Sequence, residues 1–97
     1  MDNKYLLQIK DLVLNILEDQ KTKVFIFGSR AYGDNINTSD IDIGLLPYEE
    51  IDPKKITLLK EKLEDLNVPY KVDIVDFNEV SEEFKTEALK KIILWKE

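Results

Sequence analysis

A short run of β-branched and aromatic residues, Lys-Val-Phe-Ile-Phe at positions 23–27, ends abruptly at Gly28. A run of this kind, bounded by a turn residue, predicts a strand that is buried in a sheet. Two further segments, 40–46 and 70–77, also have the composition of strands. The sequence therefore predicts a sheet of at least three strands, with other segments packed against it.

Helical periodicity precedes and separates these strands. Segments 4–19, 51–66 and 80–96 carry apolar residues at intervals of three and four positions, which predicts a helix in each. Residues 28–39 are rich in Gly, Asn, Asp and Ser, which indicates a loop with room for one helical turn. The order predicts an α/β (α+β) fold, a small mixed sheet of three or more strands flanked by helices, in a single domain over residues 1–97.

Composition limits the chemistry. The chain has 97 residues, 43% hydrophobic and 35% charged, which suits one small globular domain. Cysteine and histidine are both absent, so disulfides, structural zinc sites, iron–sulfur clusters and haem are excluded. A Ser-His-Asp or Cys-His nucleophile is excluded for the same reason. A metal ion would have to be bound by oxygen, which points to Mg²⁺, Mn²⁺ or Ca²⁺.

Charge and hydropathy indicate where the protein works. A net charge of −6 argues against direct nucleic-acid binding, which requires a basic face. The apolar runs are too short to span a bilayer, and the N-terminus lacks the basic and apolar regions of a signal peptide. We therefore expect a cytoplasmic protein with no membrane contact.

The two terminal helices are apolar over more than one stripe, which leaves two interpretations open. Their additional apolar residues are Leu6, Leu7, Leu14, Leu89, Leu94 and Trp95. Either the helices wrap around the core, or part of their surface contacts a partner protein, since contiguous exposed apolar patches usually mark an interface.

A phosphate-binding turn is predicted directly after the first strand, where the sequence reads Gly-Ser-Arg-Ala-Tyr-Gly over positions 28–33. Gly28 allows the backbone to approach a ligand closely, and the start of a short helix presents free N–H groups to an anion. Ser29 adds a hydroxyl donor. The only arginine of the chain, Arg30, also lies in this segment.

Three aspartates follow on the predicted strands. Asp40 and Asp42 are two residues apart, so both project from one face, while the apolar residues between and after them pack inward. On the third strand, Asp73 lies on the face opposite its apolar neighbours, whereas Asp76 has the wrong parity. Asp40, Asp42 and Asp73 could therefore converge beside Ser29.

This arrangement suits phosphoryl or nucleotidyl transfer. Two divalent ions would clamp the attacking and leaving oxygens of an in-line displacement, with Asp40 and Asp42 as ligands. Asp73 is the natural candidate to help the acceptor hydroxyl lose its proton. A Walker P-loop is excluded because no Gly-Lys-Ser/Thr follows the glycines. An EF-hand beginning at Asp40 is excluded because Gly44 and Ile51 occupy ligand positions.

A purely structural role for the aspartates is the alternative. Asp40 would then cap a turn, Asp42 would lie on the surface, and Asp73 would pair with a lysine. For a single aspartate this interpretation is the more probable one. For the complete set with Gly28 and Ser29, the catalytic interpretation is favoured.

With these residues identified, the sequence resembles the DNA-polymerase-β-like nucleotidyltransferase superfamily. The motif of that superfamily is Gly-Ser, a glycine a few residues later, Ser-Asp-x-Asp, and a third Asp on a later strand. Within the superfamily, the chain is most similar to the minimal nucleotidyltransferase group, MntA-like antitoxins that are paired with HEPN-domain toxins. The resemblance extends over nearly the whole chain.

The resemblance implies roles for the residues of the turn. Gly28 and Ser29 would bind the β- and γ-phosphates of the nucleotide with the help of Ser39. Arg30 matches an arginine that is frequent in this group, with either a phosphate-binding or a structural role. Tyr32 stands where many relatives have a second arginine, so a packing role is favoured there.

The resemblance also implies the reaction. Asp40, Asp42 and Asp73 would bind two Mg²⁺ ions, with Mn²⁺ as the alternative, and Asp73 would also activate the acceptor. Asp34 is interpreted as a loop residue. The expected substrate is ATP, and the expected acceptor is a tyrosine hydroxyl of a partner HEPN toxin, which receives AMP.

Two other functions stay open at this point. The chain could be a non-catalytic antitoxin that masks its partner stoichiometrically. It could also transfer a nucleotide to a small molecule or to a nucleic-acid end.

Overall fold

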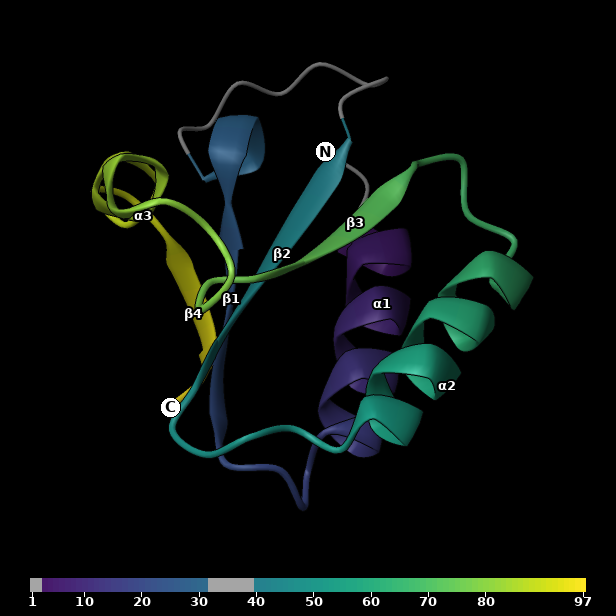
Figure 1. The fold of residues 1–97 in the computed structure, drawn as a ribbon. Helices are drawn as coiled ribbons and strands as arrows, with labels where there is room; N and C mark the ends of the chain where they lie inside the picture. Colours follow the sequence, from purple (N-terminus) through teal and green to yellow (C-terminus); the bar gives the residue numbers. More distant parts are fainter. Residues whose placement is uncertain (1–2, 32–39) are drawn as a thin grey trace.

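The computed structural model describes residues 3–31 and 40–97, apart from the side chains of Asn3 and Ser29. Within these ranges the chain forms a four-stranded sheet with helices on both sides (Figure 1). The elements are, in order, α1 (Asn3–Ile16), β1 (Thr22–Phe27), the 3₁₀ turn η1 (Gly28–Arg30), β2 (Ile41–Pro47), α2 (Pro53–Asp65), β3 (Val72–Asp76), α3 (Glu82–Ala88) and β4 (Ile93–Lys96). The predicted α/β class is confirmed.

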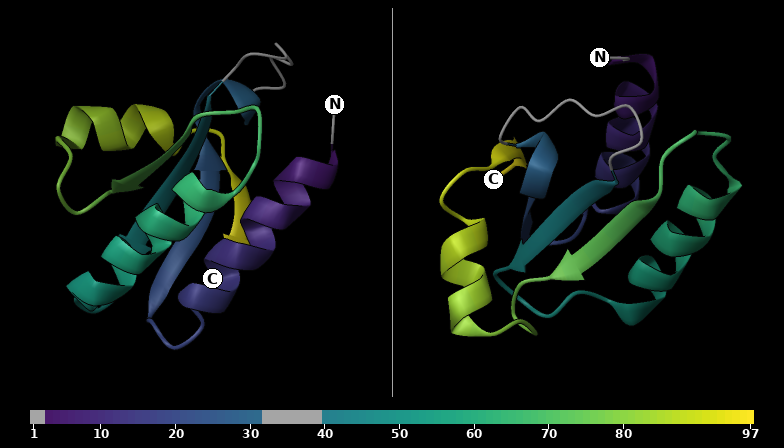
Figure 2. Two further views of the ribbon diagram at one scale, coloured as in Figure 1. Left: turned by 90° about the vertical axis from the view of Figure 1, so that its right-hand side faces the viewer. Right: turned by 90° about the horizontal axis from the view of Figure 1, so that it is seen from above.

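The sheet is mixed, with the strand order β3-β2-β1-β4. β1 pairs antiparallel with both β2 and β4, whereas β2 and β3 run parallel. A parallel pair needs a crossover connection, and α2 provides it. Helices α1 and α2 cover one face of the sheet, and α3 lies on the other (Figures 1 and 2).

Helix α2 begins where its sequence predicts. The Asp52 carboxylate accepts a hydrogen bond from the Lys54 backbone N–H at 2.9 Å, which caps the first turn. Pro53 occupies the first turn, where its missing N–H is not needed. Leu59 and Leu63 are buried against the sheet, so the amphipathic pattern sets the face that packs inward.

The larger core lies between the sheet and the two helices α1 and α2. Every second residue of β2 points into this core, and these residues, Ile41, Ile43 and Leu45, are fully buried. The smaller core on the other face is built from Phe25, Phe27 and Phe77, and it also packs against Ala88 and Leu89 at the end of α3. Its phenylalanine rings meet edge to face, with 5.0 Å between the centroids of Phe77 and each of the other two.

The prediction of one helix over residues 80–96 is wrong in its second half. Helix α3 ends at Ala88, and Ile93–Lys96 forms β4 against β1. The last residues are apolar, β-branched and aromatic, and they fit the open edge of β1 better than another helical turn. The sheet therefore has a fourth strand that the helical periodicity concealed.

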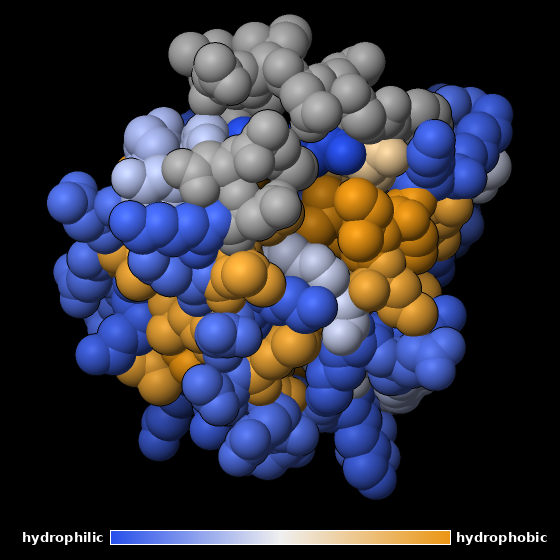
Figure 3. All heavy atoms as spheres, turned by 180° about the vertical axis from the view of Figure 1, so that it is seen from behind, coloured by the Kyte–Doolittle hydropathy of each residue, from blue (hydrophilic) through white to orange (hydrophobic). Residues whose placement is uncertain are grey.

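Some of the extra apolar residues pack against the core, as the first interpretation predicts, and others stay exposed, where contact with a partner stays a prediction. Leu6, Leu14 and Trp95 pack against the larger core. Leu7 and Leu94 keep 56% and 43% of their surface exposed. Apolar side chains are gathered on the side of the molecule that faces away in Figure 1, as Figure 3 shows.

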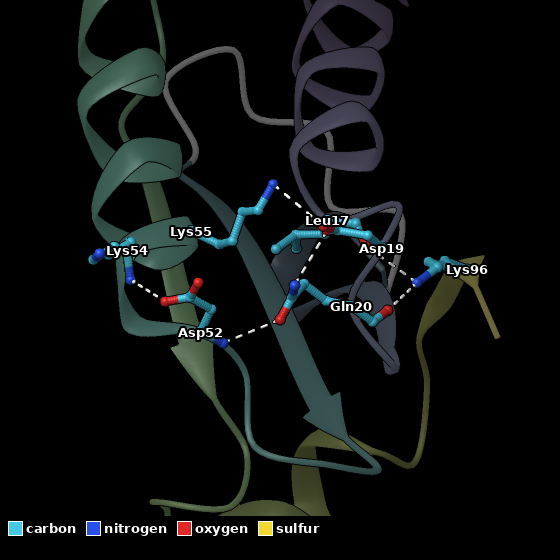
Figure 4. A network of polar contacts seen from close by, with 7 residues as sticks. All are labelled: Leu17, Asp19, Gln20, Asp52, Lys54, Lys55 and Lys96. Atoms are coloured by element: carbon cyan, nitrogen blue, oxygen red, sulfur yellow. Dashed lines mark hydrogen bonds and ion pairs between the residues drawn. The ribbon is translucent and has the colours of Figure 1, made fainter.

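A polar network joins the ends of α1, α2 and β4 (Figure 4). The Lys96 ammonium donates to the Leu17 and Gln20 carbonyl oxygens, at 3.2 and 2.5 Å. The Gln20 side-chain oxygen accepts from the Asp52 N–H at 3.0 Å. None of the helices in residues 3–31 and 40–97 is long and apolar enough to cross a membrane.

Candidate functional site

Two of the predicted aspartates are neighbours across the parallel strand pair. Asp42 of β2 and Asp73 of β3 are partners in the register, and paired residues project from the same face of a sheet. On the other side of Asp42, its partner in β1 is Phe27. The two carboxylates therefore lie on the α3 side of the sheet, beside the phenylalanine core and close to the end of β1.

Gly28 brings the turn after β1 against Asp42. Its φ of +77° lies in the left-handed region that favours glycine. A Cβ atom at this position would be 2.6 Å from the Asp42 Oδ2 atom, well inside van der Waals contact. The glycine thus allows the start of η1 and the Asp42 carboxylate to be neighbours, an arrangement that the predicted phosphate cradle beside a metal ligand would require.

The electrostatic surroundings of Asp42 oppose its negative charge. Burial raises the pKa of Asp42 above its ordinary value of 3.8, and the charges of Asp73 and Asp40 raise it further. The positive charge of Lys71 lowers it. Lys71 also approaches Asp73, with 4.0 Å between Nζ and Oδ1, in an exposed ion pair. Half-buried carboxylates that repel each other are a donor set suited to a hard divalent cation.

Asp40 lies at the border of the described residues and is exposed. In residues 3–31 and 40–97, no three acidic side chains form a group able to hold a metal ion. The structure therefore brings Asp42 and Asp73 together, while Asp40 is close enough for its charge to act on Asp42. The three-carboxylate metal site stays a prediction.

Asp76 has a structural role in the turn after β3. Its carboxylate accepts a hydrogen bond from the Asn78 N–H at 2.8 Å, and its carbonyl oxygen accepts from the Glu79 N–H at 3.0 Å. It therefore shapes the turn after β3, at the opposite end of that strand from Asp73. Strand parity chose Asp73 as the neighbour of Asp42, and the register agrees.

Arg30 is buried, with 7% of its surface exposed. Its guanidinium carbon lies 4.5 Å from the centre of the Tyr70 ring. Sequence reasoning missed Tyr70, because its position after Pro69 gives no sign of contact with a residue so distant in the chain. It also missed Lys71, whose charge acts on both aspartates.

Four predicted positions lie wholly or partly outside the described residues. The backbone of Ser29 forms part of η1, but its side chain is outside the description. Tyr32, Asp34 and Ser39 also lie outside it. The predicted roles of these residues in phosphate binding or packing stay predictions.

Relatives of this chain have been described as adenylyltransferases. Residues 10–97 match the family "Polymerase beta, Nucleotidyltransferase". The chain is 30% identical over 84 residues to MntA of Haemophilus influenzae, covering 87% of this chain and 71% of MntA. It is 30% identical over 97 residues to a protein of Methanocaldococcus jannaschii, covering 95% and 98% of the two chains. Both relatives are provisionally described as protein adenylyltransferases.

Solved structures share the fold. A protein provisionally described as a minimal nucleotidyltransferase has a TM-score of 0.72 at 28% identity, covering 96% of this chain and 95% of that one. A toxin–antitoxin crystal structure with AMP-PNP has a TM-score of 0.66 at 25% identity, covering 89% and 71%. A complex of tri-AMPylated HEPN toxin with MNT antitoxin from Shewanella oneidensis has a TM-score of 0.61 at 21% identity, covering 92% and 70%, and shows the shared fold alone.

Three observations point to the same family: the register of Asp42 with Asp73, the glycine turn beside them, and the family match over residues 10–97. The chain belongs to the polymerase beta nucleotidyltransferase family and is an enzyme of the nucleotidyltransferase type.

Proposed function

We propose that this chain transfers AMP from ATP, with the help of Mg²⁺, to a tyrosine hydroxyl of a partner HEPN toxin. The observation that carries the proposal is the pairing of Asp42 with Asp73 directly beside the Gly28 turn. A chain that only masked its partner would need neither a repelling carboxylate pair nor a glycine at φ +77° next to it.

In this proposal the glycine turn binds phosphates, and the aspartates bind metal ions. Gly28 and Ser29 bind the β- and γ-phosphates through the N-terminal end of η1, assisted by Ser39. Asp40 and Asp42 hold Mg²⁺, with Asp73 as a further ligand. When bound, the metal ions supply positive charge to the phosphate oxygens and lower the pKa of the acceptor hydroxyl.

Asp73 takes the acceptor proton in this proposal. The acceptor oxygen forms a bond to the α-phosphorus, the bond from that phosphorus to the bridging oxygen breaks, and pyrophosphate leaves. Asp73 keeps more exposed surface than a buried base would, with 41% of its side chain accessible. An acceptor from another protein can therefore reach it.

The acceptor is proposed from the relatives. Two relatives at 30% identity are described as acting on proteins, and a neighbour at 25% identity comes from a toxin–antitoxin complex with a nucleotide analogue. The MNT–HEPN complex with an AMPylated toxin shares the fold and gives the class of partner to try first. The net charge of −6 is compatible with a basic, RNA-binding partner.

The test is a transfer assay with the HEPN protein encoded beside this chain. The two proteins are incubated with ATP and Mg²⁺, and mass spectrometry follows the addition of AMP to the partner. Asp42→Asn removes a metal ligand, so we expect transfer to fall on the order of a thousandfold or more.

Asp76→Asn is the matched control, because Asp76 lies on the same strand as Asp73 but outside the site, and an asparagine oxygen can still cap the turn. Wild type and Asp76→Asn should modify the partner equally. If Asp42→Asn neutralises the partner but leaves it unmodified, the protein works by stoichiometric masking.

A further inference from the structure

The side chain of the buried Arg30 lies on the larger-core side of the sheet, whereas Asp42 and Asp73 project from the other face. Arg30 is the last residue of η1, and its guanidinium stacks on Tyr70 at 4.5 Å. Tyr70 in turn meets Tyr5 of α1 edge to face, with 6.0 Å between ring centroids and an interplanar angle of 79°. The stack of Arg30 on Tyr70 is thereby connected to the first helix.

This stack is on the opposite side of the sheet from the two aspartates. Tyr70 packs against the larger core, which lies between the sheet and helices α1 and α2. Asp42 belongs to the other face, with Gly44 and the phenylalanine core. Arg30 is 7% exposed, and its guanidinium lies over Tyr70 on the larger-core side, away from the face that carries Asp42 and Asp73.

The stack joins the two chain segments from which the site is built. At one end, η1 begins at Gly28, and its turn is closed by a 3.0 Å hydrogen bond from the Ala31 N–H to the Gly28 carbonyl oxygen. At the other end, the residue after Tyr70 is Lys71, whose carbonyl oxygen accepts from the Ile41 N–H at 2.9 Å. That bond sets the start of the β2–β3 pair, one position before Asp42 in β2.

We propose that Arg30 and Tyr70 are positioning residues, and that their stack fixes the phosphate-binding turn relative to Asp42 and Asp73. Planarity matters for this role, because a guanidinium stacks flat on an aromatic ring and an ammonium does not. The activity arm of the test rests on the proposed function, whereas the spectroscopic arm does not.

The test compares substitutions that preserve or remove the stack. Tyr70→Phe keeps the ring and should retain kcat within about twofold, since the ring face carries the interaction. Tyr70→Leu removes the ring, and Arg30→Lys keeps the charge without the plane. We expect each of these to lower kcat on the order of tenfold to a hundredfold, with a smaller change in the KM for ATP.

Several results would overturn the proposal. If Arg30 binds phosphate, Arg30→Lys should stay close to wild type and Tyr70→Leu should have no effect on kcat. The double variant Arg30→Lys/Tyr70→Leu should be little worse than either single variant, because both remove the same stack. Additive losses would contradict a shared role. Tyr48→Leu, at an exposed tyrosine, is the matched control for the loss of an aromatic ring.

Backbone NMR of the free protein separates this proposal from the proposed function. The amide resonances of both Gly28 and Asp73 should shift in Arg30→Lys and in Tyr70→Leu, and stay in place in Tyr70→Phe. Shifts confined to the neighbours of Tyr70 would overturn the positioning role whether or not the wild type modifies a partner. Arg30→Lys, the smaller change, serves if Tyr70→Leu does not fold.

Discussion

At the scale of single residues, the surroundings of Asp42 make its charged form less favourable than it is in water. Burial and the charges of Asp73 and Asp40 raise its pKa above 3.8. The folded protein therefore binds this proton more tightly than the unfolded chain, so the stability of the metal-free protein falls as pH rises through the raised pKa. At pH values below 3.8 this loss is absent.

Replacing Asp42 with asparagine should consequently stabilise the metal-free protein at neutral pH. We expect a gain of up to about 1 kcal/mol in the free energy of unfolding, after allowance for solvent screening. The gain should disappear at pH values below 3.8, where Asp42 is already neutral. Urea denaturation at both pH values measures it, with Asp76→Asn as control. A loss of stability at pH 7 would contradict the repulsion between the carboxylates.

Gly28 is the second residue whose replacement has a defined outcome. In Gly28→Ala, the left-handed backbone costs about 1–2 kcal/mol, and the new methyl group would meet Asp42 Oδ2 at 2.6 Å. We expect a lower melting temperature together with a large loss of nucleotidyl transfer, because the carboxylate has to move. Retention of full activity would show that Asp42 has room to adjust.

The positions of single residues could be predicted where the local geometry of a strand determines them. The period of two in a strand placed Asp42 and Asp73 on one face, and the register put them side by side. The contact between Arg30 and Tyr70 was not predictable, because it depends on how the segment before β3 is placed relative to η1 in the folded chain. No local pattern encodes that placement.

At the scale of elements, β4 does more than extend the sheet. Its Lys96 ammonium donates to two carbonyl oxygens that follow helix α1, those of Leu17 and Gln20. A cation near the C-terminal end of a helix also interacts favourably with the helix dipole. The last strand therefore fixes the end of the first helix.

Lys96→Met should remove this connection with little change in side-chain volume. We expect a loss of about 1.5–3 kcal/mol, typical of hydrogen bonds to a charged group. Urea titration measures it as a lower midpoint with an unchanged slope. Lys62→Met, at an exposed lysine of α2, should change stability by less than about 0.5 kcal/mol. Equal effects of the two substitutions would deny Lys96 a structural role.

Element boundaries were predictable where caps and breakers are strong. Asp52 and Pro53 mark the start of α2, and Gly28 marks the end of β1. The boundary after Ala88 was missed, because Leu89, Ile92 and Ile93 continue the helical spacing of apolar residues. Only the open edge of β1, a tertiary feature, selects a strand there.

At the scale of the whole molecule, one sheet serves two cores. Strand β1, for example, sends Ile26 into the larger core and Phe25 into the phenylalanine core. The helix-and-strand order predicted the class of fold, but not the strand order β3-β2-β1-β4, because periodicity does not say which strands are neighbours. A sheet shared in this way should couple the two cores.

Leu63→Ala and Phe77→Ala test this coupling, one in each core. Each should lower stability by about 2–5 kcal/mol, as large-to-small changes at buried sites do. Both variants should still unfold in a single transition, with coincident curves from far-ultraviolet circular dichroism and Trp95 fluorescence. An early, separate loss of helical signal in Phe77→Ala would mean that α3 and its core unfold independently.

The strand order also leaves two outer edges in the described part of the chain, on β3 and on β4. An uncovered edge is a template for strands of other molecules, and proteins oppose such growth with short edge strands and charge. Both strands are short, and β3 carries Asp73 and Asp76. Asp73, the carboxylate proposed for catalysis, is thus also one of the charges that would oppose pairing of this edge with another strand. Replacing Asp73 would then change the solubility of the protein as well as its proposed chemistry.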